Sequence, residues 1–196
     1  LIVAERPGAK SAKIQVGIGA GSLQDPQGKL GLAHLLEHLA FEGSPSRTAT
    51  EQERLRNSLG NDWNAYTYDK GVVYYGVVPS KQARQGAALI TDMFQHPAVT
   101  GPQVKQELAA VKNEMVYYGG SVVGEEGDIE ARLLHGDDPA VNNVIGTKKS
   151  VDKIPSKDLR AFHDQHFVGR NTVALVEGDP KDLPLDLIRR ELGKLP

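Results

Sequence analysis

The stretch Gly31–His38 reads Gly-Leu-Ala-His-Leu-Leu-Glu-His and lies within the apolar run Leu30–Phe41. That run is too apolar on every side for a surface helix, so it predicts a helix buried in the core. A helix turns about 100° per residue, which places His34, Glu37 and His38 within one arc of roughly 100°. Two imidazoles and a carboxylate therefore point the same way from a buried helix.

Histidines at positions i and i+4 of a helix can bind one metal ion, and for zinc each nitrogen lies about 2.0–2.1 Å from it. The order His-x-x-Glu-His is the inverted form of a common zinc-peptidase motif, with Glu37 on the same face as a candidate base. Burying three polar groups among leucine and alanine is costly unless a partner compensates, and a metal ion would do so. A plain helical core, in which hydrogen bonds satisfy both histidines, is the competing interpretation.

A catalytic zinc site has three protein ligands and an open position for water. The chain has no cysteine, so a third ligand has to come from His, Asp or Glu. A predicted helix over Pro102–Tyr118 offers Glu107 and Glu114, which are two turns apart and lie on nearly one face. Both stand among apolar residues such as Leu108 and Val111, a setting that favours a functional role for the carboxylates.

Outside the motif, periodic patterns predict a mixture of strands and helices. Apolar residues alternate over Ala12–Ile18, and the turn Asp69-Lys70-Gly71 joins two further strands into a hairpin, Trp63–Asp69 and Val72–Val78. The other expected elements are a loop over Gly19–Gly28, helices over Thr48–Leu59, Ser80–Gln95, Ile129–Leu134, Ser156–His166 and Leu183–Leu192, a break over Gly119–Gly127, a loop over Gly136–Lys149 and a strand over Thr172–Val176. Hairpins mixed with long helices indicate an α+β domain, in which a mainly antiparallel sheet packs against the helices.

The composition describes an ordinary soluble globular protein and excludes several classes. A length of 196 residues suggests a single domain over residues 1–196, without an internal repeat or linker. A formal net charge of -2 argues against a partner that is a nucleic acid. No run approaches the eighteen or so apolar residues of a transmembrane segment.

The two ends of the sequence bear on whether the chain is a piece of a longer protein. Leu1 is not a methionine and opens a strand-like run, and Pro196 follows closely on a helical pattern. We therefore expect an excised or processed piece of a longer protein. The compartment stays open between the bacterial periplasm and the cytoplasm.

The motif and its surroundings resemble one family of zinc metallopeptidases. The pattern Gly-Leu-Ala-His-x-Leu-Glu-His-x-x-Phe-x-Gly-Ser over Gly31–Ser44, followed by the pair Glu107 and Glu114, is similar to the pitrilysin, insulin-degrading enzyme and mitochondrial processing peptidase family. The resemblance implies the fold of that family and Zn²⁺ as its cofactor. It implies that His34, His38 and Glu114 hold the ion, and that Glu107 supports the site from behind.

The resemblance extends over most of the chain. The edge strand of the family, which aligns substrate in an extended form, is matched by Asn64, Ala65, Tyr66 and Thr67. Val144–Thr147 resembles a loop near the end of the family's domain. One departure is Gly60–Trp63, which replaces a more glycine-rich approach to the edge strand, so Trp63 is expected to change the neighbouring pocket.

These assignments imply a zinc-dependent endopeptidase domain that hydrolyses peptides or unfolded segments, with Glu37 as the catalytic base. Members of the family close two homologous halves around the substrate. We therefore expect this chain to need a second domain or partner subunit and to be poorly active alone. The alternative is a non-catalytic or partner-dependent subunit of the same fold that binds peptide, and the presence of all five site residues counts against it.

Two other features do not predict a site. His163 and His166 could share a helix face, but solvated histidines at a helix end are the favoured interpretation. A signal-molecule lyase shares the inverted motif, but its chemistry relies on a cysteine that this chain lacks.

Overall fold

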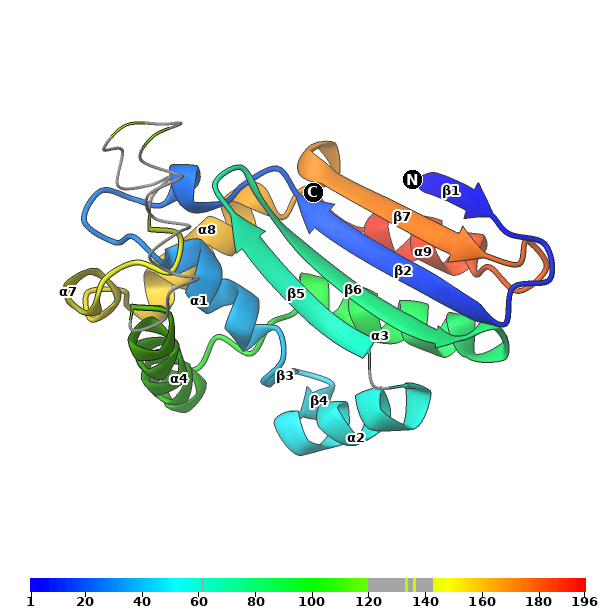
Figure 1. Ribbon diagram of the computed structural model, residues 1–196, viewed down its shortest axis with the longest axis horizontal. Coiled ribbons are helices and arrows are strands. Elements are labelled where there is room, and N and C mark those ends of the chain that lie inside the picture. The colour runs from blue at the N-terminus through cyan, green and yellow to red at the C-terminus, as the bar shows by residue number, and fades with distance from the viewer. Residues whose placement is uncertain (61, 120–132, 134–135, 137–142) are drawn as a thin grey trace.

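The computed structural model describes residues 1–60, 62–119, 133, 136 and 143–196, and the expected helix over Ile129–Leu134 and most of the expected break over Gly119–Gly127 lie outside this part. A five-stranded sheet organises the fold (Figure 1). Its strands, in spatial order, are β1 (Ile2–Glu5), β7 (Thr172–Gly178), β2 (Ser11–Ile18), β6 (Gly71–Pro79) and β5 (Asp62–Tyr68). Only β1 and β7 pair in parallel, so the predicted α+β class with a mainly antiparallel sheet is confirmed.

Helices cover one face and one end of this sheet. Two helices, α3 and α9, lie behind it in Figure 1, whereas α1 and α4 lie beside the end formed by β5. The described helices are α1 (Leu32–Leu39), α2 (Ala49–Leu59), α3 (Ala83–Gln95), α4 (Gly101–Gly119), α7 (Lys148–Val151), α8 (Ser156–His166) and α9 (Leu185–Leu192), with 3₁₀ turns at Ser22–Gln24, Ser80–Gln82 and Gly169–Asn171.

The alternation in the strands decides which sheet face is buried. In β2, Ala12, Ile14, Val16 and Ile18 are buried, while the residues between them are at least partly exposed. The predicted hairpin is confirmed, because β5 pairs antiparallel with β6 through the turn before Gly71. Since β5 stands last in the sheet, its second edge pairs with no strand of the described residues.

Several details differ from the sequence prediction. Gly31 adopts a left-handed conformation, with φ of 92°, so α1 begins at Leu32 instead of Leu30. The loop expected up to Lys149 ends earlier, because Thr147 and Ser150 form a capping box that begins α7. A two-stranded hairpin of β3 (Gly43–Ser44) and β4 (Arg47–Thr48) was not predicted, and its strands are too short for alternation to show.

The second helix is tied to the end of the first. The predicted capping box at Thr48 and Glu51 is confirmed, with the Glu51 carboxylate accepting from Thr48 N at 2.9 Å. From the next residue, the Gln52 side-chain amide donates to Ala40 O at 2.8 Å. Gln52 is fully buried, so α2 fixes the point at which the chain leaves α1.

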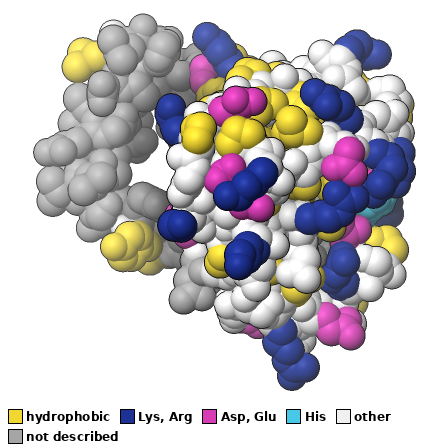
Figure 2. Space-filling model, turned by 90° about the vertical axis from the view of Figure 1, so that its right-hand side faces the viewer, with side chains coloured by type: hydrophobic (Ala, Val, Ile, Leu, Met, Phe, Trp, Pro, Cys, Tyr) yellow, Lys and Arg dark blue, Asp and Glu magenta, His cyan; other side chains and the backbone are white. Residues whose placement is uncertain are grey.

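Figure 2 shows the face at the right-hand side of Figure 1. Lysine and arginine side chains are interspersed there with aspartate, glutamate and hydrophobic side chains, so this face carries no continuous basic surface. A mixed surface of this kind agrees with the net charge of -2. Among the described helices, none combines the length and the apolar character needed to cross a membrane.

Candidate metal centre

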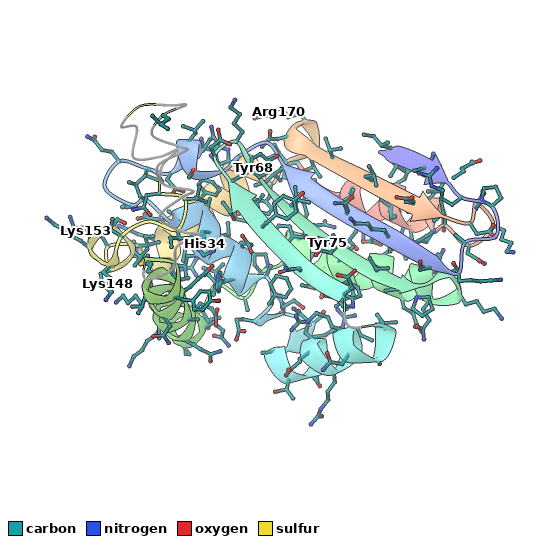
Figure 3. The ribbon with its side chains drawn as sticks, in the orientation of Figure 1. His34, Tyr68, Tyr75, Lys148, Lys153 and Arg170 are labelled. Carbon is teal, nitrogen blue, oxygen red and sulfur yellow. The ribbon has the colours of Figure 1, made fainter. Side chains whose placement is uncertain are left out.

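The metal motif lies where α1 meets α4. His34, labelled in Figure 3, and His38 project from α1, and Glu114 projects from α4. Glu114 Oε2 lies 3.5 Å from His34 Nε2 and 3.3 Å from His38 Nε2. One ligand atom from each residue lies within 4.8 Å of the other two. The structure therefore brings together the three residues that the sequence predicted.

These distances fit a zinc ion. Ligand atoms held tetrahedrally at about 2.0–2.1 Å from zinc are about 3.3 Å from one another. Glu114 Oε2 is buried, and among the described residues no hydrogen bond of acceptable geometry reaches it, although both imidazoles are close. An acceptor at ligand-to-ligand distance from two nitrogens is the arrangement expected of three groups that could hold one ion.

Glu107 stands behind one of the histidines. Its Oε2 lies 3.0 Å from His38 Nδ1, and the carboxylate is buried. This carboxylate favours a proton on Nδ1, so Nε2 is the nitrogen that faces Glu114 and that could bind a metal ion after losing its own proton. The Nδ1 atom of His34 is buried and has no such partner among the described residues. The support that the resemblance implied for Glu107 thus reaches one imidazole only.

Glu37 occupies the same face of α1 but turns toward β5. Its Oε2 accepts a hydrogen bond of 2.5 Å from the Thr67 hydroxyl. Burial raises the pKa of Glu37 to about 7, although the Thr67 hydroxyl favours the charged form. The sequence predicted Thr67 only as part of the substrate-aligning strand and missed this contact. The alternation of β5 was the available signal, because Trp63, Ala65 and Thr67 share the side that faces α1.

The two imidazoles differ in their electrostatics. Burial and the neighbouring His38 ring lower the pKa of His34 to about 4, so its imidazole is neutral at pH 7. Burial opposes charge on His38 as well, but the hydrogen bond to Glu107 and the nearby Glu114 carboxylate raise its pKa to about 9. In the protein alone, His38 therefore carries a proton at neutral pH.

The first turn of α1 is held by Asp25, which the sequence analysis placed only in a loop. Its carboxylate accepts from the backbone N–H groups of Gly31, Leu32 and Ala33 at 2.7, 3.2 and 2.9 Å. These donors have no partner within a helix, so the carboxylate satisfies them. Burial raises the pKa of Asp25 to about 6, and the three backbone donors oppose that shift.

The loop that resembles part of the family's domain packs against the same turn. A Cβ atom on Gly31 would lie 2.5 Å from Ile145 O, and one on Gly146 would lie 2.2 Å from Leu30 O. The Ser150 hydroxyl donates to Leu30 O at 2.8 Å. Loop Val144–Thr147 thus sets the position at which the metal-motif helix begins.

A cavity of about 500 Å³ opens beside the three candidate ligands. Asn64 and Ala65 of β5 lie in its wall with Glu37 and His38. Ala65 is buried on the α1 side of the strand, whereas Tyr66 lies on the other face and is 48% exposed. Of the four predicted substrate residues, two therefore line the cavity, Tyr66 points away from it, and Thr67 contacts Glu37.

One expectation about the remaining histidines was wrong. His163 is not solvated, because its ring stacks on Phe167 with centroids 4.3 Å apart and its Nε2 lies 3.3 Å from Phe94 O. His166 packs against Phe162 with centroids 4.5 Å apart. Over the described residues, these histidines join no metal-binding group, and the group of His34, His38 and Glu114 is the one found.

A buried helix with an inverted His-x-x-Glu-His motif, completed by a glutamate from a second helix beside a mainly antiparallel sheet, defines the class of inverted-motif metallopeptidases. Residues 1–119 match the family model described as insulinase, peptidase family M16. The chain belongs to this family. The predicted relationship to pitrilysin and its relatives is confirmed.

Individual relatives agree with this placement. A protein named an uncharacterized zinc protease from Mycobacterium leprae is 28% identical over 188 residues, which cover 95% of this chain and 42% of that protein. The structure of the first half of the periplasmic protease PqqL from Escherichia coli is similar with a TM-score of 0.84 and 25% identity, over 99% of this chain and 43% of that one. A peptidase M16 inactive domain from Pseudomonas fluorescens shares the fold, with a TM-score of 0.83 and 20% identity over 99% of this chain and 48% of that one. The chain thus spans less than half the length of each.

Zinc binding should release a proton from the protein. His38 is protonated at pH 7 because its pKa is about 9, and zinc requires the neutral imidazole, so we expect about one proton to be released per ion bound. The apparent affinity should rise with pH and level off above about 9, where the proton no longer competes. Calorimetry in buffers of different ionisation enthalpy measures the release, and Glu107→Gln, which removes the stabilising carboxylate, should reduce it. Equal heats in all buffers would contradict the protonated His38.

Asp25→Ala should destabilise the fold, because three backbone N–H groups at the start of α1 lose their acceptor. The expected loss is about 1–3 kcal/mol in the free energy of unfolding, with Asp25→Asn intermediate because one acceptor oxygen remains. Urea denaturation without zinc measures the loss. Asp164→Ala, which removes an aspartate that is 81% exposed, serves as the control and should change little. If the Asp25→Ala chain is as stable as this control, Asp25 does not stabilise the first turn of α1.

Proposed function

We propose that this chain is the zinc-binding domain of an endopeptidase that cleaves peptides or unfolded segments. The observation that supports the proposal most strongly is the position of Glu114 Oε2 at 3.5 and 3.3 Å from the two Nε2 atoms of α1. Membership of the peptidase family and a relative named as a zinc protease point the same way. His34, His38 and Glu114 are the proposed ligands.

A bound zinc ion supplies a Lewis acid that polarises a peptide carbonyl and acidifies a water molecule. Glu37 is the group of this chain that takes up the proton and delivers it to the leaving amine. A pKa of about 7 suits a base that must both accept and donate near neutral pH. The Thr67 hydroxyl engages Oε2 of Glu37, which leaves Oε1 for the proton.

The substrate is proposed to add to the sheet as an extended strand along Asn64–Thr67. The second edge of β5 is unpaired among the described residues, and its inner side faces the candidate ligands across the cavity. Main-chain hydrogen bonds to such an edge hold a peptide without reading each side chain. The strand thereby places a peptide bond within reach of Glu37 and the metal.

We propose that a homologous second half completes the active enzyme. The chain spans 42% of the zinc protease relative and 43% of the first half of PqqL, so the relatives contain further polypeptide. One open strand edge grips the peptide from a single side, and positioning a substrate can lower a barrier by several kcal/mol. The alternative, a peptide-binding subunit without activity, is disfavoured by the complete set of proposed ligands and base.

Glu37→Gln and Glu114→Gln should distinguish the proposed base, Glu37, from the proposed metal ligand, Glu114. The glutamine cannot accept a proton, so peptide hydrolysis should fall by at least about 10²-fold while zinc content stays near that of the native chain. Glu114→Gln should lose both zinc and hydrolysis. Elemental analysis and a peptide-cleavage assay, performed with the second half present, measure the two effects. If both variants lose zinc equally, the roles assigned to these glutamates are wrong.

The isolated chain should fold and bind zinc, because every proposed ligand and Glu107 lie within it. It should nevertheless cleave peptides poorly until the homologous half is added, in the same polypeptide or as a separate chain. Cleavage at matched zinc occupancy, with and without that half, tests this. Full activity from a verified monomer of residues 1–196 would contradict the need for a second half and leave the zinc site unaffected.

A further inference from the structure

The cavity beside the candidate ligands extends past them to a second wall. Beyond His38 it is lined by Phe41 and Glu42 after α1, by Arg56 of α2 and by Trp63 of β5. None of these residues touches the proposed metal or base. The wall nevertheless belongs to the same cavity, so a peptide lying along β5 would place a side chain against it.

Arg56 is a half-buried cation without a close counter-charge. Its guanidinium lies over the Phe41 ring, 4.9 Å from the centroid, and its Nε is buried without a hydrogen-bond partner. Over the described residues, no carboxylate approaches it within ion-pair distance, and the charges of Glu53 and Glu42 act on it only from further away. Buried polar nitrogens are normally hydrogen-bonded, so Nε of Arg56 lacks an acceptor among the described residues.

Trp63 offers a second donor in the same wall. Its indole Nε1 is buried and has no partner among the described residues. The ring is held by its packing over Gly76 of β6, where even a Cβ atom would come within 2.5 Å of it. Trp63 and Arg56 thus line one pocket, and each carries a buried nitrogen donor without an acceptor among the described residues.

We infer that Arg56 and Trp63 form a subsite that binds an acidic side chain of the substrate. A carboxylate can accept two hydrogen bonds from a guanidinium and a further one from an indole, and such charge-assisted pairs are the strong ones. The inference rests on the proposed function, because the peptide that presents the side chain is the strand added to β5.

The pleat of that strand determines which side chain enters. Trp63, Ala65 and Thr67 share one side of β5, and Thr67 marks the position of Glu37. In an added strand, the side chains opposite these three residues lie on the same side. The residue opposite Trp63 therefore enters the subsite, four positions along the peptide from the residue opposite Thr67.

Acidic groups in the same cavity could instead favour a basic side chain. However, the Glu42 carboxylate accepts a hydrogen bond of 2.9 Å from Gln106, and Glu107 is engaged by His38 at 3.0 Å. Both carboxylates already have donors, whereas Arg56 Nε and Trp63 Nε1 have no acceptor among the described residues. Apart from Glu114, which is a proposed metal ligand, the unsatisfied groups on this side of the cavity are donors, so this wall prefers an acid.

Peptide binding to the Glu37→Gln chain tests the subsite without turnover. Trp63 is the single tryptophan of the sequence, so its fluorescence reports on the pocket directly. The ligands are extended peptides rich in threonine and valine, without tryptophan or tyrosine, in which one Glu, Gln or Lys is moved along the sequence. At one position the Glu peptide should bind about tenfold more tightly than the Gln peptide, and the Lys peptide more weakly, with or without zinc.

Variants of α2 complete the test. Arg56→Gln should abolish the difference between Glu and Gln peptides, and Arg56→Glu should reverse the preference toward Lys. Arg54→Gln removes an exposed arginine of the same helix that does not line the cavity, so it should keep the preference. Equal binding of all three peptides at every position, tighter binding of Lys, or a preference that survives Arg56→Gln would overturn the subsite.

The outcomes also separate this inference from the proposed function. Peptides that bind without charge preference refute the subsite alone. A charge preference that depends on Arg56, in a protein whose zinc-loaded native form with its second half cleaves nothing, refutes catalysis alone. The absence of any peptide binding, by fluorescence and by calorimetry, refutes strand addition to β5 and the subsite with it.

Discussion

The structure depends on the burial of a helix that carries three ionisable side chains. Seven of the eight residues of α1 are buried, and two of the seven are His34 and Glu37. Such groups are tolerated in a core only when hydrogen bonds or ions satisfy them. The surrounding elements supply those partners: α4 brings Glu107 and Glu114 to the histidines, and β5 brings Thr67 to Glu37. The packing of α4 and β5 around α1 therefore reflects the partners that its buried ionisable side chains require.

The same constraint explains why α1 is fixed at both ends. Asp25 and the loop before Ser150 hold its first turn, while Gln52 holds the carbonyl of Ala40 just after its last. A helix of eight residues is too short to be stable by itself, so its direction comes from these contacts. The proposed ligand atoms would have to stay about 3.3 Å apart around a zinc ion, and such a rigid support suits that requirement.

The sequence predicted the parts of the site that depend on one element. Spacing along a helix brought His34, Glu37 and His38 together, and a second helix offered Glu107 and Glu114 on one face. Residue spacing within one helix does not predict contacts between elements that are distant in the sequence. Thr67 reaches Glu37 and Asp25 reaches Ala33 because the chain folds back on itself. The alternation of β5 indicates the side on which Thr67 lies, but no local pattern identifies the partner of either residue. The contrast between the pKa values of His34 and His38 has the same origin, since Glu107 contacts one ring only.

The edge strand links the candidate site to the proposed second half. Proteins usually protect an open sheet edge with lysine, proline or a covering element. β5 (Asp-Trp-Asn-Ala-Tyr-Thr-Tyr) has neither lysine nor proline, and Tyr66 and Tyr68 are 48% and 42% exposed on the side away from α1. An edge left open in this way is a liability for an isolated domain and an advantage for a domain that receives a peptide strand. Enclosure by the proposed second half would remove this liability, because it would cover the open edge of β5 and hold a bound peptide there.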